Sequence, residues 1–133
     1  MDEQQPSADE PFDDDVYVRG WWQRSEYFHG EHRDDAAGYA LDWAETGVMD
    51  QVRRGDPVSA VSLLDRLLDA PGAAPEIVAY GPLQALLEDR GPEVEHDVAR
   101  LCASETTWRE AVGFVVLTDK QQAAVPALAA YLG

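Results

Sequence analysis

Glycine and proline interrupt the apolar periodicity of this chain at three places, Gly55-Asp56-Pro57, Gly81-Pro82 and Gly91-Pro92. Proline lacks a backbone donor and clashes with the preceding turn, so we expect no helix to run unbroken through these steps. Between them, apolar residues recur every three or four positions, which is typical of a helix that buries one face. The chain therefore predicts short helices rather than long ones.

The first helix is expected to begin at the acidic run Asp13-Asp14-Asp15, because negative side chains are favoured at a helix N-terminus. Its apolar stripe contains Tyr17, Trp21 and Phe28, and Gly30 is expected to end it. Similar stripes occupy residues 36–44, 61–68, 77–87, 94–101 and 125–132. This pattern predicts successive helices along most of the chain.

Specific residues predict where some helices start and stop. Asp56 and Pro57 are a typical N-cap and first helical residue, and Asp119 is expected to cap the last helix. Gly81-Pro82 is expected to break or kink its helix. The β-branched stretch 112–117 is compatible with helix or strand, and we favour helix.

These elements predict an all-α fold of six to seven short helices, in an irregular bundle or a small α-solenoid-like stack of antiparallel pairs. Residues 1–15 hold seven acidic residues, no basic ones and only Phe12 as a large apolar side chain, which predicts a disordered acidic segment. Residues 16–133 have the length of one domain, so we expect a single helical domain there.

The formal charge of −16 comes from 26 acidic and 10 basic residues. Direct nucleic-acid binding is disfavoured because it depends on Lys and Arg neutralising phosphates. The same charge repels an anionic membrane and attracts a basic protein. The charge therefore favours a basic protein as partner, although acidity also serves solubility alone.

Cysteine use and hydropathy indicate a cytoplasmic protein. The single cysteine, Cys102, cannot form an internal disulfide and is expected to be a small core residue. No basic segment followed by an apolar stretch opens the chain, and no run of about 18 apolar residues occurs, so we expect neither a signal peptide nor a membrane span.

The strongest metal-ligand pattern is His29-Gly30-Glu31-His32, because imidazole and carboxylate groups together can bind a divalent ion. The helical zinc-hydrolase spacing is absent, so a solvated polar turn is the favoured interpretation. Nucleophile motifs and a phosphate-binding glycine loop are also missing. The sequence therefore predicts a protein that is not an enzyme, with no catalytic residue, cofactor or metal.

Several motifs together resemble an uncharacterised family of small bacterial helical domains. They are Trp21-Trp22, Trp43, Asp56-Pro57, Leu63-Leu64, Leu67-Leu68, Gly81-Pro82-Leu83, Leu86-Leu87 and Gly91. In that family an acidic residue commonly follows the Gly-Pro-Leu step and a His precedes the later glycine, whereas this chain has Gln84 and Arg90. The resemblance covers roughly residues 16–117 and implies an all-helical fold without a particular activity.

Our leading hypothesis is a cytoplasmic immunity or antitoxin-type protein that covers a basic partner, since carboxylates pair with the Arg and Lys of a nucleic-acid-binding toxin. The residues predicted to bind that partner are Trp22, Glu26, Glu31, Asp34 and Asp35. One alternative is a helical adaptor or scaffold without a toxin partner. The other is a metal-dependent enzyme that uses His29 and His32.

Overall fold

Helices make up all the regular secondary structure in the computed structural model, which describes residues 2–133. The predicted all-α fold is therefore confirmed. None of the helices in this range is long and apolar enough to cross a membrane. The chain divides into two units, residues 1–50 and 51–133, and the division falls inside a helix.

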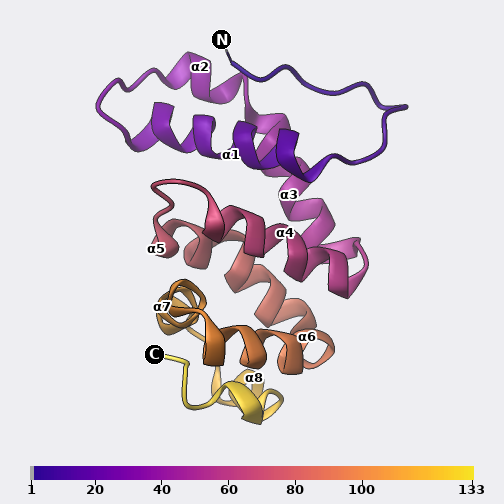
Figure 1. Cartoon of the computed structure of the whole chain (residues 1–133), viewed down its shortest axis with the longest axis vertical. Coiled ribbons are helices and arrows are strands. Elements are labelled where there is room, and N and C mark those ends of the chain that lie inside the picture. Colours follow the sequence, from indigo (N-terminus) through magenta and orange to yellow (C-terminus); the bar gives the residue numbers. More distant parts are fainter. Residues whose placement is uncertain (1) are drawn as a thin grey trace. The chain divides into compact units, whose positions relative to one another are not determined.

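The first unit holds α1 (Asp14–His29), α2 (Asp35–Tyr39) and most of α3 (Asp42–Arg54). Asp13 caps α1 by accepting a hydrogen bond from the Asp15 amide at 3.0 Å, and Gly30 ends the helix, as the sequence predicts. α1 and α2 lie side by side (Figure 1). The acidic run thus starts the helix that carries most of the aromatic residues.

Glycines in this unit make room for aromatic rings. A Cβ at Gly20 would lie 2.9 Å from the Trp43 ring, and one at Gly38 would lie 2.7 Å from the Phe28 ring. α3 runs through Gly47 without interruption, and a Cβ there would overlap the ring of Tyr17. These glycines therefore act through packing rather than by weakening their helices.

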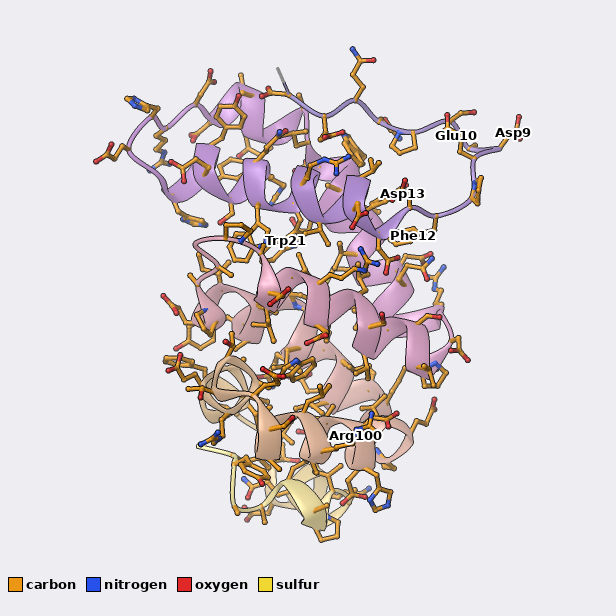
Figure 2. The ribbon with its side chains drawn as sticks, in the orientation of Figure 1. Asp9, Glu10, Phe12, Asp13, Trp21 and Arg100 are labelled. Atoms are coloured by element: carbon orange, nitrogen blue, oxygen red, sulfur yellow. The ribbon has the colours of Figure 1, made fainter. Side chains whose placement is uncertain are left out.

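Residues 2–12 contact α1 through polar and aromatic side chains. Tyr27 donates to Asp2 at 2.6 Å, Arg19 pairs with Glu3 at 2.6 Å, and Phe12 stacks on Tyr17 with ring centroids 4.2 Å apart. Figure 2 shows Phe12 and Asp13 at the start of α1, after the turn that carries Asp9 and Glu10.

The sequence predicts a disordered segment over 1–15 and one domain over 16–133. These boundaries stay a prediction, and the two structural units divide the chain at a different place. Residue 1 lies outside the described part of the chain.

The second unit contains α4 (Pro57–Asp69), α5 (Pro75–Val78), η1 (Ala79–Leu83), α6 (Gln84–Ser104), α7 (Thr106–Phe114), α8 (Asp119–Ala123) and η2 (Pro126–Leu128). Its buried side chains include Leu63, Leu64, Leu67, Leu83, Leu86, Leu87, Val98 and Trp108. Within this apolar set, the Trp108 indole donates to Asp65 at 2.8 Å and so links α7 to α4. Polar pairing thus satisfies the one donor of this buried indole.

Gly81-Pro82 was expected to break or kink its helix, and the break is not found. Residues 79–83 form a π-helical turn that joins α5 to α6. The wider turn accommodates the missing proline donor without ending the helix. Gly91-Pro92 does produce a kink, which lies at Arg90, where φ is −138° and ψ is 22°.

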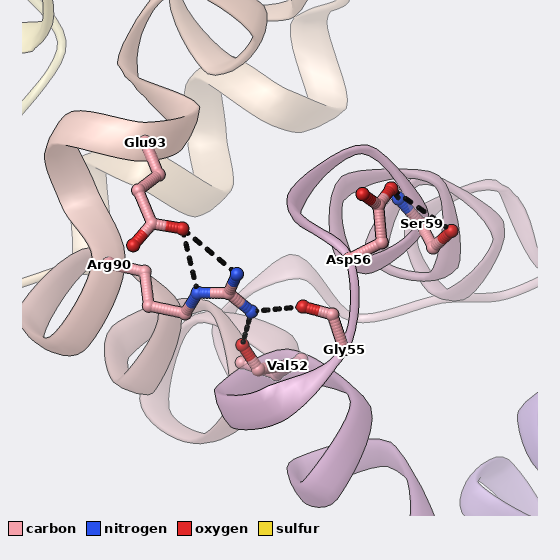
Figure 3. A network of polar contacts seen from close by, with 6 residues as sticks. All are labelled: Val52, Gly55, Asp56, Ser59, Arg90 and Glu93. Carbon is pink, nitrogen blue, oxygen red and sulfur yellow. Dashed lines mark hydrogen bonds and ion pairs between the residues drawn. The ribbon is translucent and has the colours of Figure 1, made fainter.

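Arg90 and Gln84 connect elements of the second unit. The Arg90 guanidinium donates to the carbonyls of Val52 and Gly55 and also pairs with Glu93 at 2.9 Å (Figure 3). The Gln84 amide donates to the Val116 carbonyl at 2.6 Å and accepts from the Val116 amide at 3.0 Å. Both residues therefore satisfy backbone groups that no helix satisfies.

Residues 112–117 are only partly helical, because α7 ends at Phe114 and the chain then runs extended without forming a strand. The predicted cap of the last helix was wrong by one residue. Thr118 caps α8, because its hydroxyl accepts a hydrogen bond from the Gln121 backbone amide at 3.1 Å. The Thr118 backbone amide in turn donates to the Gln121 side-chain oxygen at 2.9 Å. Asp119 instead occupies the first turn.

Candidate protein-binding surface

Negative charge is concentrated in the first unit. Residues 1–50 hold 14 acidic and 3 basic side chains, a net charge of −11, whereas residues 51–133 hold 12 and 7, a net charge of −5. Among the acidic residues between positions 2 and 133, only Glu95 is buried, where it accepts from the Ala127 amide at 2.7 Å. The excess charge therefore lies on the surface of the first unit.

Two of the predicted partner-binding residues, Trp22 and Glu26, lie one turn apart on α1. Trp22 is half-buried, with its ring edge-on to that of the buried Trp21 at 4.7 Å. Glu26 is exposed, and its carboxylate lies beside the backbone of Gly30. The structure thus places one aromatic and one acidic predicted residue on the same helix.

The other predicted residues, Glu31, Asp34 and Asp35, are exposed around the turn between α1 and α2. The Asp34 amide donates to the Tyr27 carbonyl at 2.9 Å, which folds this turn back onto the last turns of α1. Asp34 also caps α2 by accepting from the Ala37 amide at 3.1 Å. The predicted carboxylates therefore gather at one end of the α1–α2 pair.

Asp35 already has a basic neighbour. Arg33 pairs with it at 2.9 Å, and this hydrogen bond lowers the pKa of the Asp35 carboxyl and raises that of Arg33. Asp34 and Asp35 thus have local structural roles, whereas Glu26 and Glu31 are the better residues for testing a contact surface by mutation.

His29 and His32 are both exposed beside this turn. Across residues 2–133, no group of three or more His, Cys, Asp or Glu side chains is arranged to hold a metal ion. The enzyme alternative that uses His29 and His32 stays a prediction.

An open cavity of about 590 Å³ lies within the first unit, a feature that the sequence interpretation missed. Its lining includes Tyr17, Tyr39, Asp42, Trp43 and Asp50. The rings of Tyr17 and Trp43 meet edge-on at 5.3 Å. The cavity therefore combines aromatic rings with carboxylates.

A sequence signal for this cavity exists on α3. Asp42, Thr46 and Asp50 recur every four residues, which places them on one helical face, and Gly47 opens that face beside them. The contribution of Tyr39 could not be read in this way, because the bend between α2 and α3 sets its position.

Arg24 shows how this unit holds a guanidinium. It donates to Asp42 at 2.8 Å and pairs with Glu45 at 2.7 Å, both on the first turn of α3. Its guanidinium carbon also lies 4.7 Å from the centre of the Phe28 ring. Carboxylates and an aromatic face together thus form a partly buried arginine site from residues of the first unit.

Comparison with known proteins finds no family model, curated protein or solved structure that matches this chain. The resemblance to a family of small bacterial helical domains therefore stays a prediction.

Proposed function

We propose that this chain is a protein-binding module that covers a basic partner through the acidic surface of its first unit, in the manner of an immunity or antitoxin-type inhibitor. The observation that supports this proposal is the net charge of −11 on residues 1–50, which remains after the three arginines of this unit are counted. Such a surface speeds encounter with a basic protein and opposes binding to nucleic acid. A toxin that binds nucleic acid is a fitting partner because its active cleft is basic.

The contact surface in this proposal combines Trp22, Glu26, Glu31, Asp34 and Asp35. Half-buried aromatic residues provide contact area at interfaces, and surrounding carboxylates set orientation and association rate. Since rim charges act mainly on association, binding should weaken as salt rises.

Charge reversal tests this proposal directly. The tagged protein would be used to capture partners from its native cell extract at about 50 and 200 mM salt, a range over which surface charges are increasingly screened, with quantitative mass spectrometry as readout. The test variant is Glu26→Lys with Glu31→Lys. The matched control, Asp69→Lys with Glu110→Lys, changes the net charge equally at exposed positions of the second unit.

A single basic protein that is retained at low salt, released at high salt and lost only from the Glu26/Glu31 variant would support the proposal. Its inhibition by the purified chain would then establish the inhibitor role. Retention that neither salt nor either double variant changes would contradict it.

A second candidate function is that of a helical adaptor. An exposed apolar group in the second unit favours it, consisting of Tyr80, Phe114 and Val116 with exposed fractions of 65%, 40% and 77%. Exposed apolar groups are typical of protein contacts. This candidate predicts that Tyr80→Ser abolishes partner binding and that raising the salt concentration leaves partner binding unchanged.

A further inference from the structure

Residues 2–12, which we call the strap, lie on one face of α1 without forming a helix or strand. Their contacts fall on Arg19, Gln23 and Tyr27, which are four residues apart and therefore share that face. The Glu3 carboxylate pairs with Arg19 at 2.6 Å, and the Glu3 amide donates to the Gln23 side-chain oxygen at 2.9 Å. Together with the bond from Tyr27 to Asp2 at 2.6 Å, these contacts hold the start of the strap.

The contacts of the strap are exposed to water. None of residues 2–12 is buried, and the paired side chains of Arg19 and Glu3 remain 56% and 24% exposed. Exposed ion pairs contribute little to stability, whereas fixing the backbone of each strap residue costs conformational entropy. The docked and released states of the strap are therefore close in free energy.

The overall charge of the first unit opposes docking. Residues 2–12 hold four acidic and no basic side chains, and residues 13–50 hold 10 acidic and three basic ones, a net charge of −7. Of these three arginines, Arg24 and Arg33 pair with carboxylates outside the strap. The strap thus lies against a body of like charge, and a cationic partner would relieve this repulsion.

The start of the strap adjoins the proposed contact surface. Tyr27 donates through its hydroxyl to Asp2, and its backbone carbonyl accepts from the Asp34 amide at 2.9 Å. The charge of Asp34 also helps to raise the pKa of the Tyr27 phenol, after the larger effect of Asp2. A basic partner that contacts Asp34 would therefore meet the Asp2 carboxylate as well.

We propose that residues 2–12 are a releasable strap, which leaves the Arg19–Gln23–Tyr27 face of α1 when a basic partner takes over its carboxylates. The inference rests on the proposed function and adds a conformational change to it. A ligand shifts such an equilibrium only by binding one state more tightly than the other. Here the difference is that α1 engages Asp2 and Glu3 in the docked state, whereas the released strap offers both carboxylates to the partner.

The test uses the full chain, labelled with ¹⁵N and ¹³C-tyrosine, and an acetylated and amidated hexa-arginine peptide as the basic probe. Hexa-citrulline is the neutral probe. NMR would follow hydrogen exchange of the Glu3 amide, which Gln23 protects, and the ring signals of Tyr27. The double variant Asp2→Asn with Arg19→Gln provides the signals of a released strap. Hexa-arginine should accelerate the exchange and move the Tyr27 signals towards that reference, and hexa-citrulline should do neither.

A matched pair of variants tests the coupling between release and binding without changing the charge. Tyr27→Phe keeps the ring and removes only the hydroxyl that donates to Asp2. It should increase both the Glu3 exchange rate and the affinity for hexa-arginine by up to about 10-fold, the size expected for one hydrogen bond. The control is Tyr131→Phe, which makes the same change at a half-buried tyrosine of the second unit and should alter neither quantity.

Each contrary outcome overturns a different step. Hexa-arginine that shifts the amide signals of Glu26 and Glu31 while the Tyr27 signals stay in the docked position would overturn the release and leave the proposed function intact. An affinity that Tyr27→Phe changes no more than Tyr131→Phe does would overturn the coupling between release and binding. Absence of hexa-arginine binding at low salt would contradict the proposed function, and the inference with it.

Discussion

The ring of Tyr17 on α1 lies against the backbone of α3 at Gly47, where a Cβ would overlap the ring. Gly47→Ala should therefore destabilise the protein by about 1–3 kcal/mol, the usual cost of overpacking, although alanine favours helix over glycine by about 1 kcal/mol. Urea unfolding, followed by circular dichroism and by the Trp43 indole signal, would measure the change.

Gly113→Ala provides the control for Gly47→Ala. Gly113 is exposed on α7, and the nearest atom to an added Cβ is the Tyr131 carbonyl oxygen at 3.8 Å. This variant should be neutral or slightly stabilising. If both variants are stabilising, the result would contradict a close contact between the Tyr17 ring and α3.

Thr118 and Asp119 should contribute unequally to stability. Thr118→Ala removes the capping box of α8 and should cost about 1 kcal/mol. Asp119→Ala removes only a favourable charge from the first turn and should cost about 0.5 kcal/mol or less. Chemical denaturation of both variants would check the order, and a larger loss for Asp119→Ala would contradict the assigned cap.

The thiol of Cys102 should be unreactive at neutral pH. Burial raises its pKa to about 11, because desolvation disfavours the thiolate more than nearby Arg109 favours it. Only thiolate reacts readily with alkylating reagents, so labelling of the folded chain should be slow at pH 8 and fast after denaturation. Rapid labelling of the folded chain at pH 8 would show that Cys102 is accessible.

The same shift gives a direction for stability at alkaline pH. The folded pKa of Cys102 lies above the value of 9.0 typical of an unperturbed thiol. The folded state then retains its proton more strongly, so this contribution is complete below about pH 9 and is lost as pH rises through about 11. Cys102→Ser would test this dependence, since it removes the titration from that window.

Tyr27 reports on the N-terminal segment. Its hydrogen bond to Asp2 raises the pKa of the phenol, with a smaller contribution from the charge of Asp34. Asp2→Asn should lower the pKa of Tyr27 towards its ordinary value near 10, measured by NMR of ¹³C-labelled tyrosine. Asp9→Asn, on the same segment but at its exposed turn, should leave the pKa unchanged. Equal pKa values in the wild type and Asp2→Asn would indicate that residues 2–12 do not remain on α1.

Local signals in the sequence were enough for the all-helical fold and several helix ends. Asp13 and Asp56 each satisfy free amides at a helix start, and Gly30 ends α1, because capping depends on a few adjacent residues. The apolar stripe of α4 likewise identified its buried leucines. Periodicity alone carried this information, since it depends only on the geometry of one helix.

Tertiary structure decided the features that depend on residues distant in the chain. Gly81-Pro82 lies in a π-helical turn within a continuous helix. Gln84 and Arg90 donate hydrogen bonds to backbone carbonyls 32 and 35 residues away in the sequence. The cavity that joins Tyr17 to Tyr39 and Asp50 requires α1, α2 and α3 to meet, which no local pattern specifies. The sequence by itself determined the helices and the surface charge, because both are properties of single segments. Tertiary packing decided which charged side chains contact which aromatic rings, because these contacts join residues from different helices.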